Sequence, residues 1–252
     1  MIIFIDTIFM FSIFKKEIIS FFSSLTGYIS IVIFLFLTGW FMWINPGELN
    51  ILDGGYSTID TLFFIAPWVF LFLVPAATMR SFAEERKTGT IELLLTRPIT
   101  DIQLVIAKYM AAIMLVVLSL LPTLIYYVSI YYLGNPVGNI DGGGTWGSFI
   151  GLFFLAAAYA AIGVFSSSIT DNQIVAFIIA AILCFFIYTG FDGLASLSLF
   201  KSINLSVQNL GINEHYKSLS RGVIDSRDIL YFLSLIAVFI LAARLKLQAR
   251  RW

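Results

Sequence analysis

The chain has 252 residues, of which 60% are hydrophobic and only 12% are charged, and its mean hydropathy is +0.95. Soluble domains carry about 25% charged residues, so this composition excludes an ordinary soluble domain and predicts a polytopic membrane protein. The formal net charge is zero, which argues against nucleic acid as a partner. The single cysteine, Cys184, lies in an apolar run and has no second cysteine to pair with, so we expect a buried structural thiol.

The N-terminal region predicts an amphipathic helix before the first span. Over residues 11–25, a helical wheel places Phe14 and Ile18 on an apolar side and Lys16 on a polar side. Such a helix lies in the membrane interface, and we expect Lys15 and Lys16 to point toward the headgroups. The two lysines follow the first apolar residues instead of preceding them, so no cleavable signal peptide is expected.

Six apolar stretches predict membrane-spanning helices, because a bilayer is crossed by about 20 apolar residues. The expected spans are residues 25–44, 61–79, 101–133, 148–165, 173–191 and 229–244. Pro67 and Pro75 should loosen or kink the second span. Sequences with the form of a capping box, Thr100–Gln103 and Thr170–Gln173, predict where the third and fifth spans begin. The chain is therefore expected to form a single all-α transmembrane domain over residues 1–252.

The positions of lysine and arginine predict the orientation, because cytoplasmic segments carry an excess of them. Most of the fifteen basic residues lie near the termini and between the second and third spans, whereas loops 45–60 and 134–147 hold none. Both termini are therefore expected in the cytoplasm. Residues 192–228 then form an extracytoplasmic loop, in which the basic residues are balanced by acidic ones.

A polar segment, residues 82–98, joins the second and third spans and holds the densest charge in the chain. Gly89 allows a tight turn after the charged run, and Thr88 or Thr90 can cap a helix that begins after this turn. A charged segment between two bilayer-length apolar runs must be an exposed connection.

The second half of this segment predicts a short amphipathic helix over residues 90–96. Ile91, Leu94 and Leu95 fall at helical spacing on one face, and Pro98 ends the helix. Two helical turns cannot cross a bilayer, so the helix either rests on the membrane surface or fills a groove on another protein.

The sequence holds no pattern typical of an active site. It lacks a GxxxxGK[ST] phosphate loop, so we do not expect it to hydrolyse ATP unaided. His215 is the single histidine and has no second ligand with which to hold a metal ion. Lys108 is expected in the cytoplasm or among the headgroups, and the other charges also map to span ends. Secondary transporters place ionisable groups or broken helices at mid-depth, so this distribution disfavours an ion-coupled carrier.

The polar segment resembles the connection between the second and third spans of ABC-2 type exporter permeases, whose pattern is E-E-[RK]-x-x-G-T-[IL]-E-L-L-L-x-x-P. The chain matches this pattern at Glu84, Glu85, Arg86, Gly89, Thr90, Ile91, Glu92, Leu93, Leu94, Leu95 and Pro98. Residues 215–228 also resemble that family's tail region. This external segment includes His215, Arg221, Asp225, Arg227 and Asp228.

Three further stretches, residues 66–68, 133–139 and 172–177, are similar to the gliding-motility permease subunit GldF of the Bacteroidota. The resemblance covers nearly everything from Met10 to Leu247. The family usually begins where Met10 stands, so both Met1 and Met10 are candidate starts.

The resemblance implies a non-catalytic membrane subunit of an ATP-driven exporter in the bacterial inner membrane, with a role in gliding motility. Cytoplasmic ABC ATPase subunits would bind ATP and Mg²⁺, and the 90–96 helix would be the element that couples to them. The helix at 11–25 would be the family's connecting helix, and loop 192–228 would carry short helices near the exit. A second membrane subunit with a large extracytoplasmic domain, or a second copy of this chain, would complete the pair.

Two other functions stay open at this point: an ion-coupled carrier or channel, and a membrane scaffold that anchors gliding machinery without transport. The substrate is not specified either. Spans rich in aromatic residues, with 25 phenylalanines in the chain, fit lipid-like cargo, force transmission and simple exposure to the bilayer equally well.

Overall fold

The computed structural model describes residues 2–92, 99–197 and 203–249. Every regular element in these residues is a helix, which confirms the all-α prediction. Six of the helical stretches are long and apolar enough to cross a membrane, so the chain is a multi-pass membrane protein. These stretches are Gly27–Ile44, Asp60–Lys87, Asp101–Leu133, Gly142–Ile169, Gln173–Ala195 and Ser226–Gln248.

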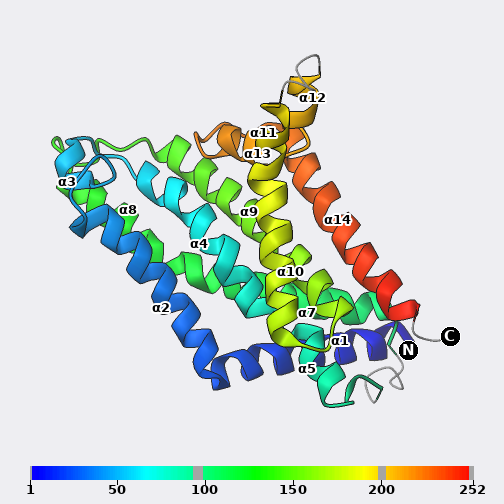
Figure 1. Ribbon diagram of the computed structural model, residues 1–252. Helices are drawn as coiled ribbons and strands as arrows, with labels where there is room; N and C mark the ends of the chain where they lie inside the picture. The colour runs from blue at the N-terminus through cyan, green and yellow to red at the C-terminus, as the bar shows by residue number, and fades with distance from the viewer. Residues whose placement is uncertain (1, 93–98, 198–202, 250–252) are drawn as a thin grey trace.

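Several spans are built from more than one helical segment (Figure 1). The first three spans comprise α2 (Leu25–Gly39) with the π-helical turn η1 (Trp40–Ile44), α4 (Asp60–Thr78) with α5 (Arg80–Lys87), and α7 (Asp101–Leu120) with η2 (Leu121–Thr123) and α8 (Leu124–Leu133). The last three comprise α9 (Gly142–Ile169), α10 (Gln173–Phe185) with η3 (Phe186–Gly190) and α11 (Phe191–Ala195), and α14 (Ser226–Gln248). Short helices α3 (Ile51–Gly54), α12 (Asn204–Gln208) and α13 (Ile212–Leu219) lie at one end of the bundle.

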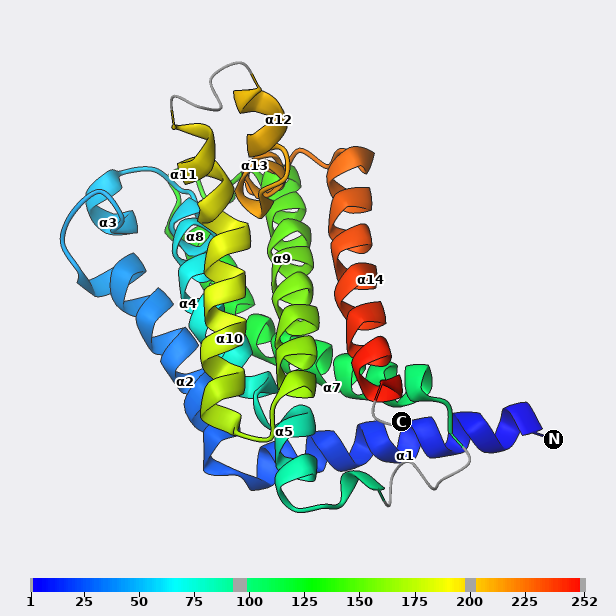
Figure 2. The same cartoon turned by 45° about the vertical axis from the view of Figure 1, so that its right-hand side comes forward.

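The N-terminal helix α1 (Ile2–Ser23) lies across the other end of the bundle, next to α5 (Figure 2). Its face toward the bundle combines apolar and charged residues. Ile13 is buried in an apolar cluster with Phe82 and Leu104, and Glu17 also points into the protein, whereas Phe11 is 63% exposed. Glu17 lies on the polar side of this helix and binds Lys108 inside the protein, whereas Lys15 and Lys16, for which contact with headgroups is expected, are exposed. A helical wheel cannot distinguish a face that meets water from one that meets charged partners.

Helix α9 is the central helix of the bundle. In its most apolar window 78% of the residues are buried, compared with 17% in the corresponding window of α14. The contact face of α9 is built from small residues, including Ala156, Ala160 and Gly163. A Cβ atom added at Gly163 would collide with the side chain of Thr78, so this glycine allows α4 and α9 to pack closely.

The helix starts follow local capping. The predicted box at Thr100 is confirmed: its hydroxyl accepts from the backbone N–H of Gln103, whose side chain accepts from the N–H of Thr100. The second predicted box is wrong, because the N-cap of α10 is Asn172, whose side chain accepts from the N–H of Ile174. Asparagine there already satisfies a free N–H of the first turn, which leaves the threonine outside the helix.

Two helices begin earlier than the hydropathy pattern indicates. Asp141 caps α9, and its side chain accepts from the N–H of Gly144, so the glycine-rich stretch is helical. Asp225 caps α14 in the same way through the N–H of Arg227. Hydropathy marks where a chain becomes apolar, whereas the caps set where its helix starts.

The short helix α13 closes the end of the bundle opposite α1. The hydroxyl of Tyr216 donates to the backbone oxygen of Phe63 on α4 at 2.7 Å, and Leu219 packs against α9 at Gly151. Burial raises the pKa of Tyr216 well above its usual range, with a smaller contribution from Tyr188. The buried hydroxyl thus binds the loop between the fifth and sixth spans to the second span.

Candidate functional site

The polar segment begins at a break in the second span, between α4 and α5. Helix α4 runs through Pro67 and Pro75 and ends at Thr78, after which Met79 interrupts the helix. The hydroxyl of Ser167 on α9 accepts from the N–H groups of Phe82 and Ala83, at 2.8 and 3.1 Å. One buried serine thus replaces helix hydrogen bonds at the break. Ser167 therefore has a structural role, which the sequence did not reveal.

Helix α5 ends in a turn that confirms the predicted role of Gly89. Thr88 is the C-cap, and Gly89 follows it with a φ of +70°, the left-handed conformation that glycine adopts most readily. The hydroxyl of Thr88 donates back to the carbonyl oxygen of Glu84 at 2.9 Å. The glycine and threonine of the motif therefore stop the helix and turn the chain.

A buried ion-pair cluster joins α1, α5 and α7 directly beside this turn. The Lys108 side chain has no exposed surface, and its Nζ atom lies 2.6 Å from Glu17 Oε1 and 3.0 Å from Glu85 Oε2. It also donates to the carbonyl oxygen of Ser81 at 2.5 Å, and it lies 5.0 Å from the ring centre of Phe82. Lys108 is therefore buried inside the protein at this end of the bundle and is not exposed at its surface.

A second lysine completes the cluster. Lys16 donates to Glu85 Oε1 at 2.8 Å, so Glu85 lies between two cations. Partial burial lowers the pKa of Lys16, but the hydrogen bond from Lys16 and the nearby carboxylates more than offset this effect and leave the pKa raised. Two lysines and two glutamates balance in formal charge, as a buried cluster requires, because an unpaired buried charge costs several kcal/mol.

The predicted contact residues do not all face outward. Glu85, which is 7% exposed, and Ile91, which is 8% exposed, are buried against other parts of the chain. They are therefore not available to a partner at this surface. Glu84, Lys87 and Glu92 are exposed.

The remaining members of the predicted contact set differ in position. Gly89 and Thr90 are exposed, and Arg86 is half-buried, with no hydrogen-bond partner for its Nε and Nη2 atoms among the described residues. Leu94 and Leu95 lie outside the described residues. Of the predicted N-terminal group, Lys15 is exposed and Phe14 and Ile18 are half-buried.

The tail segment at the opposite end also combines structural and exposed residues. His215 lies between two acceptors, with Nδ1 2.7 Å from Asp228 Oδ1 and Nε2 3.0 Å from the carbonyl oxygen of Asn209. Its ring stacks on Tyr231 at 3.9 Å. These contacts fix α13 to α14. Asp225 is the cap of α14, and Arg221 and Arg227 are exposed.

The comparison with protein families agrees with this architecture. The profile described as ABC-2 family transporter protein matches residues 9–244, which is most of the chain. The comparison with curated proteins gave no match. Permeases of this family are generally non-catalytic membrane subunits. The chain therefore belongs to the ABC-2 transporter family and is a membrane subunit of an ABC transporter.

Proposed function

We propose that this chain is the permease subunit that couples cytoplasmic ATPase subunits to movement of its own spans, in a bacterial inner membrane with both termini inside. ATP and Mg²⁺ would be bound by those ATPase subunits. The observation that supports this proposal is the end of α5. There the second span ends in the Gly89 turn, which leaves Glu84, Lys87 and Glu92 exposed.

The cluster around Lys108 offers a route for this coupling. Helix α5 is bound to α7 by Lys108, to α1 by Lys16, and to α9 through Ser167. A displacement of the turn after α5 would therefore be transmitted to α1, α7 and α9 through these polar contacts. Because packed helices shift as rigid bodies, a displacement here would move spans and not only a loop.

The partners follow from the family resemblance. A second membrane subunit with a large extracytoplasmic domain, or a second copy of this chain, would complete the complex. The similarity of residues 66–68, 133–139 and 172–177 to GldF supports a role in gliding motility.

The test is retention of the ATPase subunit. We would isolate the tagged chain from native membranes, wash it in detergent and measure the ATPase subunit kept per permease. The Leu94→Asp variant should retain little of the ATPase subunit. Leu94→Ala and Leu95→Ala should each retain clearly less than wild type, and Glu92→Gln should retain nearly as much as wild type. An apolar anchor in a small interface is worth roughly 2 kcal/mol or more, over tenfold in affinity, whereas an exposed ion pair is worth about 0–1 kcal/mol.

Val223→Asp is the matched control, because Val223 is an exposed apolar residue in the segment between α13 and α14. Full retention by Leu94→Asp would contradict the coupling role of residues 90–96. A retained ATPase without any nucleotide-dependent movement of the spans would instead favour a scaffold.

A further inference from the structure

The end of the bundle at α13 contains a cavity of about 770 Å³. It lies between the start of α4, the start of α9 and α13, and its size is in the range of small-ligand pockets, roughly 300–1,000 Å³. Hydroxyl groups line much of it. Those side chains are Ser57, Thr58, Thr145, Ser148, Thr189 and Ser220.

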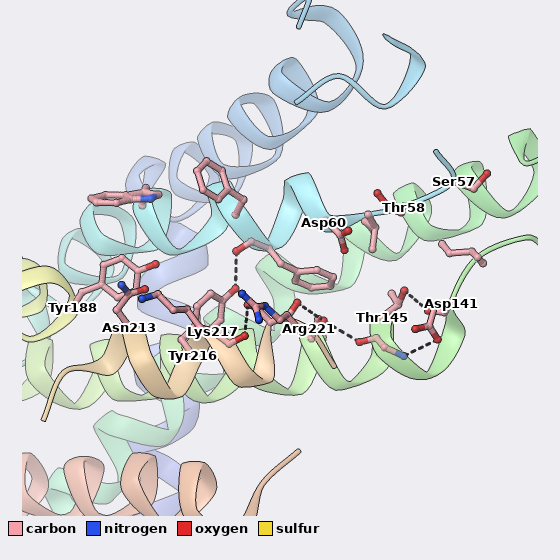
Figure 3. A pocket seen from close by; sticks show the side chains of 18 of the residues that line it. Ser57, Thr58, Asp60, Asp141, Thr145, Tyr188, Asn213, Tyr216, Lys217 and Arg221 are labelled. Carbon is pink, nitrogen blue, oxygen red and sulfur yellow. Dashed lines mark hydrogen bonds between the residues drawn. The ribbon is translucent and has the colours of Figure 1, made fainter. Parts of the chain in front are cut away.

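Charges of both signs also line this cavity. Figure 3 shows Asp60 on the α4 side and Lys217 and Arg221 on the α13 side. Among the described residues, the side chains of Asp60 and Arg221 have no ion-pair or hydrogen-bond partner, whereas Lys217 binds Glu214 at 2.6 Å. An unneutralised carboxylate and an unneutralised guanidinium around one cavity match a ligand that itself carries both charges.

A second cavity continues from the first along the side of the bundle. This apolar groove has a volume of about 650 Å³ and lies between α2, α4 and α10. Ser30 is the single polar side chain among its described lining residues, which include Ile33, Phe72 and Phe177. The groove runs along helices that are long and apolar enough to cross a membrane.

The two cavities meet at Phe64 and Trp68, which line both of them. These side chains are 62% and 41% exposed, so they are available to a ligand. Tryptophan is typical of the boundary between headgroups and hydrocarbon, because its ring is apolar and its N–H is polar. A polar cavity therefore adjoins an apolar one, with aromatic residues between them.

We infer that these joined cavities bind a zwitterionic amphiphile, with the chemistry of a phosphoethanolamine lipid. The phosphate faces Arg221 and Lys217, the ammonium faces Asp60, and the hydrocarbon tail lies in the groove past Phe64 and Trp68. A purely polar ligand would leave the groove unfilled, and a hydrocarbon alone would leave both charges unused. The polar cavity lies at the end opposite the Gly89 turn, whereas the groove extends along α4 to Met79, so labelling is measured on the purified chain without the ATPase.

The experiment uses the full-length chain in detergent and a phosphatidylethanolamine probe with a photoactivatable group in its tail. After illumination, labelled peptides are identified and labelling is titrated with the probe. Label is expected on the segments that contain Trp68 and Phe177. Arg221→Gln and Asp60→Asn should each weaken labelling about tenfold, and a phosphatidylglycerol probe, which lacks the ammonium, should label less.

Matched variants separate this site from ordinary contact with lipid. Ile33→Trp fills the groove and should abolish labelling there, whereas Val32→Trp alters the neighbouring side chain, which is 62% exposed and does not line the groove. Arg227→Gln and Asp171→Asn are the charge controls outside the cavity. Folding of each variant is checked by the protection of the buried Cys184 thiol from a dye.

Two results would overturn the inference. Equal labelling by both probes, unchanged in Arg221→Gln and Asp60→Asn, would show boundary lipid without a headgroup site. Loss of a dimer in Ile33→Trp, with lipid labelling unchanged, would show that a second copy of the chain covers the groove instead.

Discussion

Lys108 on α7 and Glu85 on α5 form an ion pair of 3.0 Å in which both side chains are almost fully removed from solvent. Glu85 belongs to the motif that resembles the family's coupling segment, yet it binds its own chain. The motif therefore has two parts. Glu85 and Ile91 are buried against the bundle, whereas Glu84, Lys87 and Glu92 are exposed.

The first prediction concerns this ion pair. Lys108→Met should destabilise the protein by roughly 3–5 kcal/mol, because it leaves the buried Glu85 and the half-buried Glu17 with too few cations. Lys87→Met, which alters an exposed lysine, should have little effect. The measurement is thermal unfolding in detergent, followed by exposure of Cys184 to a thiol-reactive dye. Equal unfolding temperatures for wild type and Lys108→Met would show that the cluster does not stabilise the fold.

The second prediction concerns the break between α4 and α5. Ser167→Ala should cost about 1–3 kcal/mol and speed amide hydrogen exchange at Phe82 and Ala83, since both N–H groups lose their acceptor. Ser166→Ala is the control, because Ser166 is equally buried but its hydroxyl donates only to Ile162 of its own helix. Equal amide exchange rates at Phe82 and Ala83 in the two variants would show that Ser167 does not stabilise the break between α4 and α5.

The third prediction uses the raised pKa of Tyr216. A phenol whose pKa is raised by folding contributes stability that is present below the unfolded pKa, about 10, and is lost as the pH rises above it. Tyr216→Phe should cost about 1 kcal/mol at neutral pH, because it removes the hydrogen bond to Phe63. The difference in unfolding free energy between wild type and Tyr216→Phe should shrink above about pH 10. Tyr132→Phe, at an exposed position, should show neither effect.

The fourth prediction concerns orientation. In a Cys184→Ser background, single cysteines at Asn139 and Ser206 should react with an impermeant thiol reagent in intact cells, and one at Thr88 should not. The reason is the excess of lysine and arginine on the side of the Gly89 turn. All three positions are exposed, so a difference in labelling reports the side of the membrane. Labelling at Thr88 without labelling at Asn139 would show that the topology is the opposite of the predicted one.

The sequence by itself determined the class of the protein and the features that depend on neighbouring residues. Long apolar runs can satisfy their backbone hydrogen bonds in a membrane only as helices or closed barrels, so composition and hydropathy predicted the spans. The box at Thr100 and the turn at Gly89 were readable because capping and left-handed turns depend on a few adjacent side chains.

Only the tertiary structure decided which charges are buried and which helix faces meet. Lys108 and Glu17 are separated by 91 residues, and Ser167 and Phe82 by 85, so no local pattern links them. Periodicity identified the polar face of α1, but it could not identify Lys108 as the residue that binds Glu17 on that face. The two cavities could not be predicted from the sequence either, because their lining residues come from segments that only tertiary packing brings together.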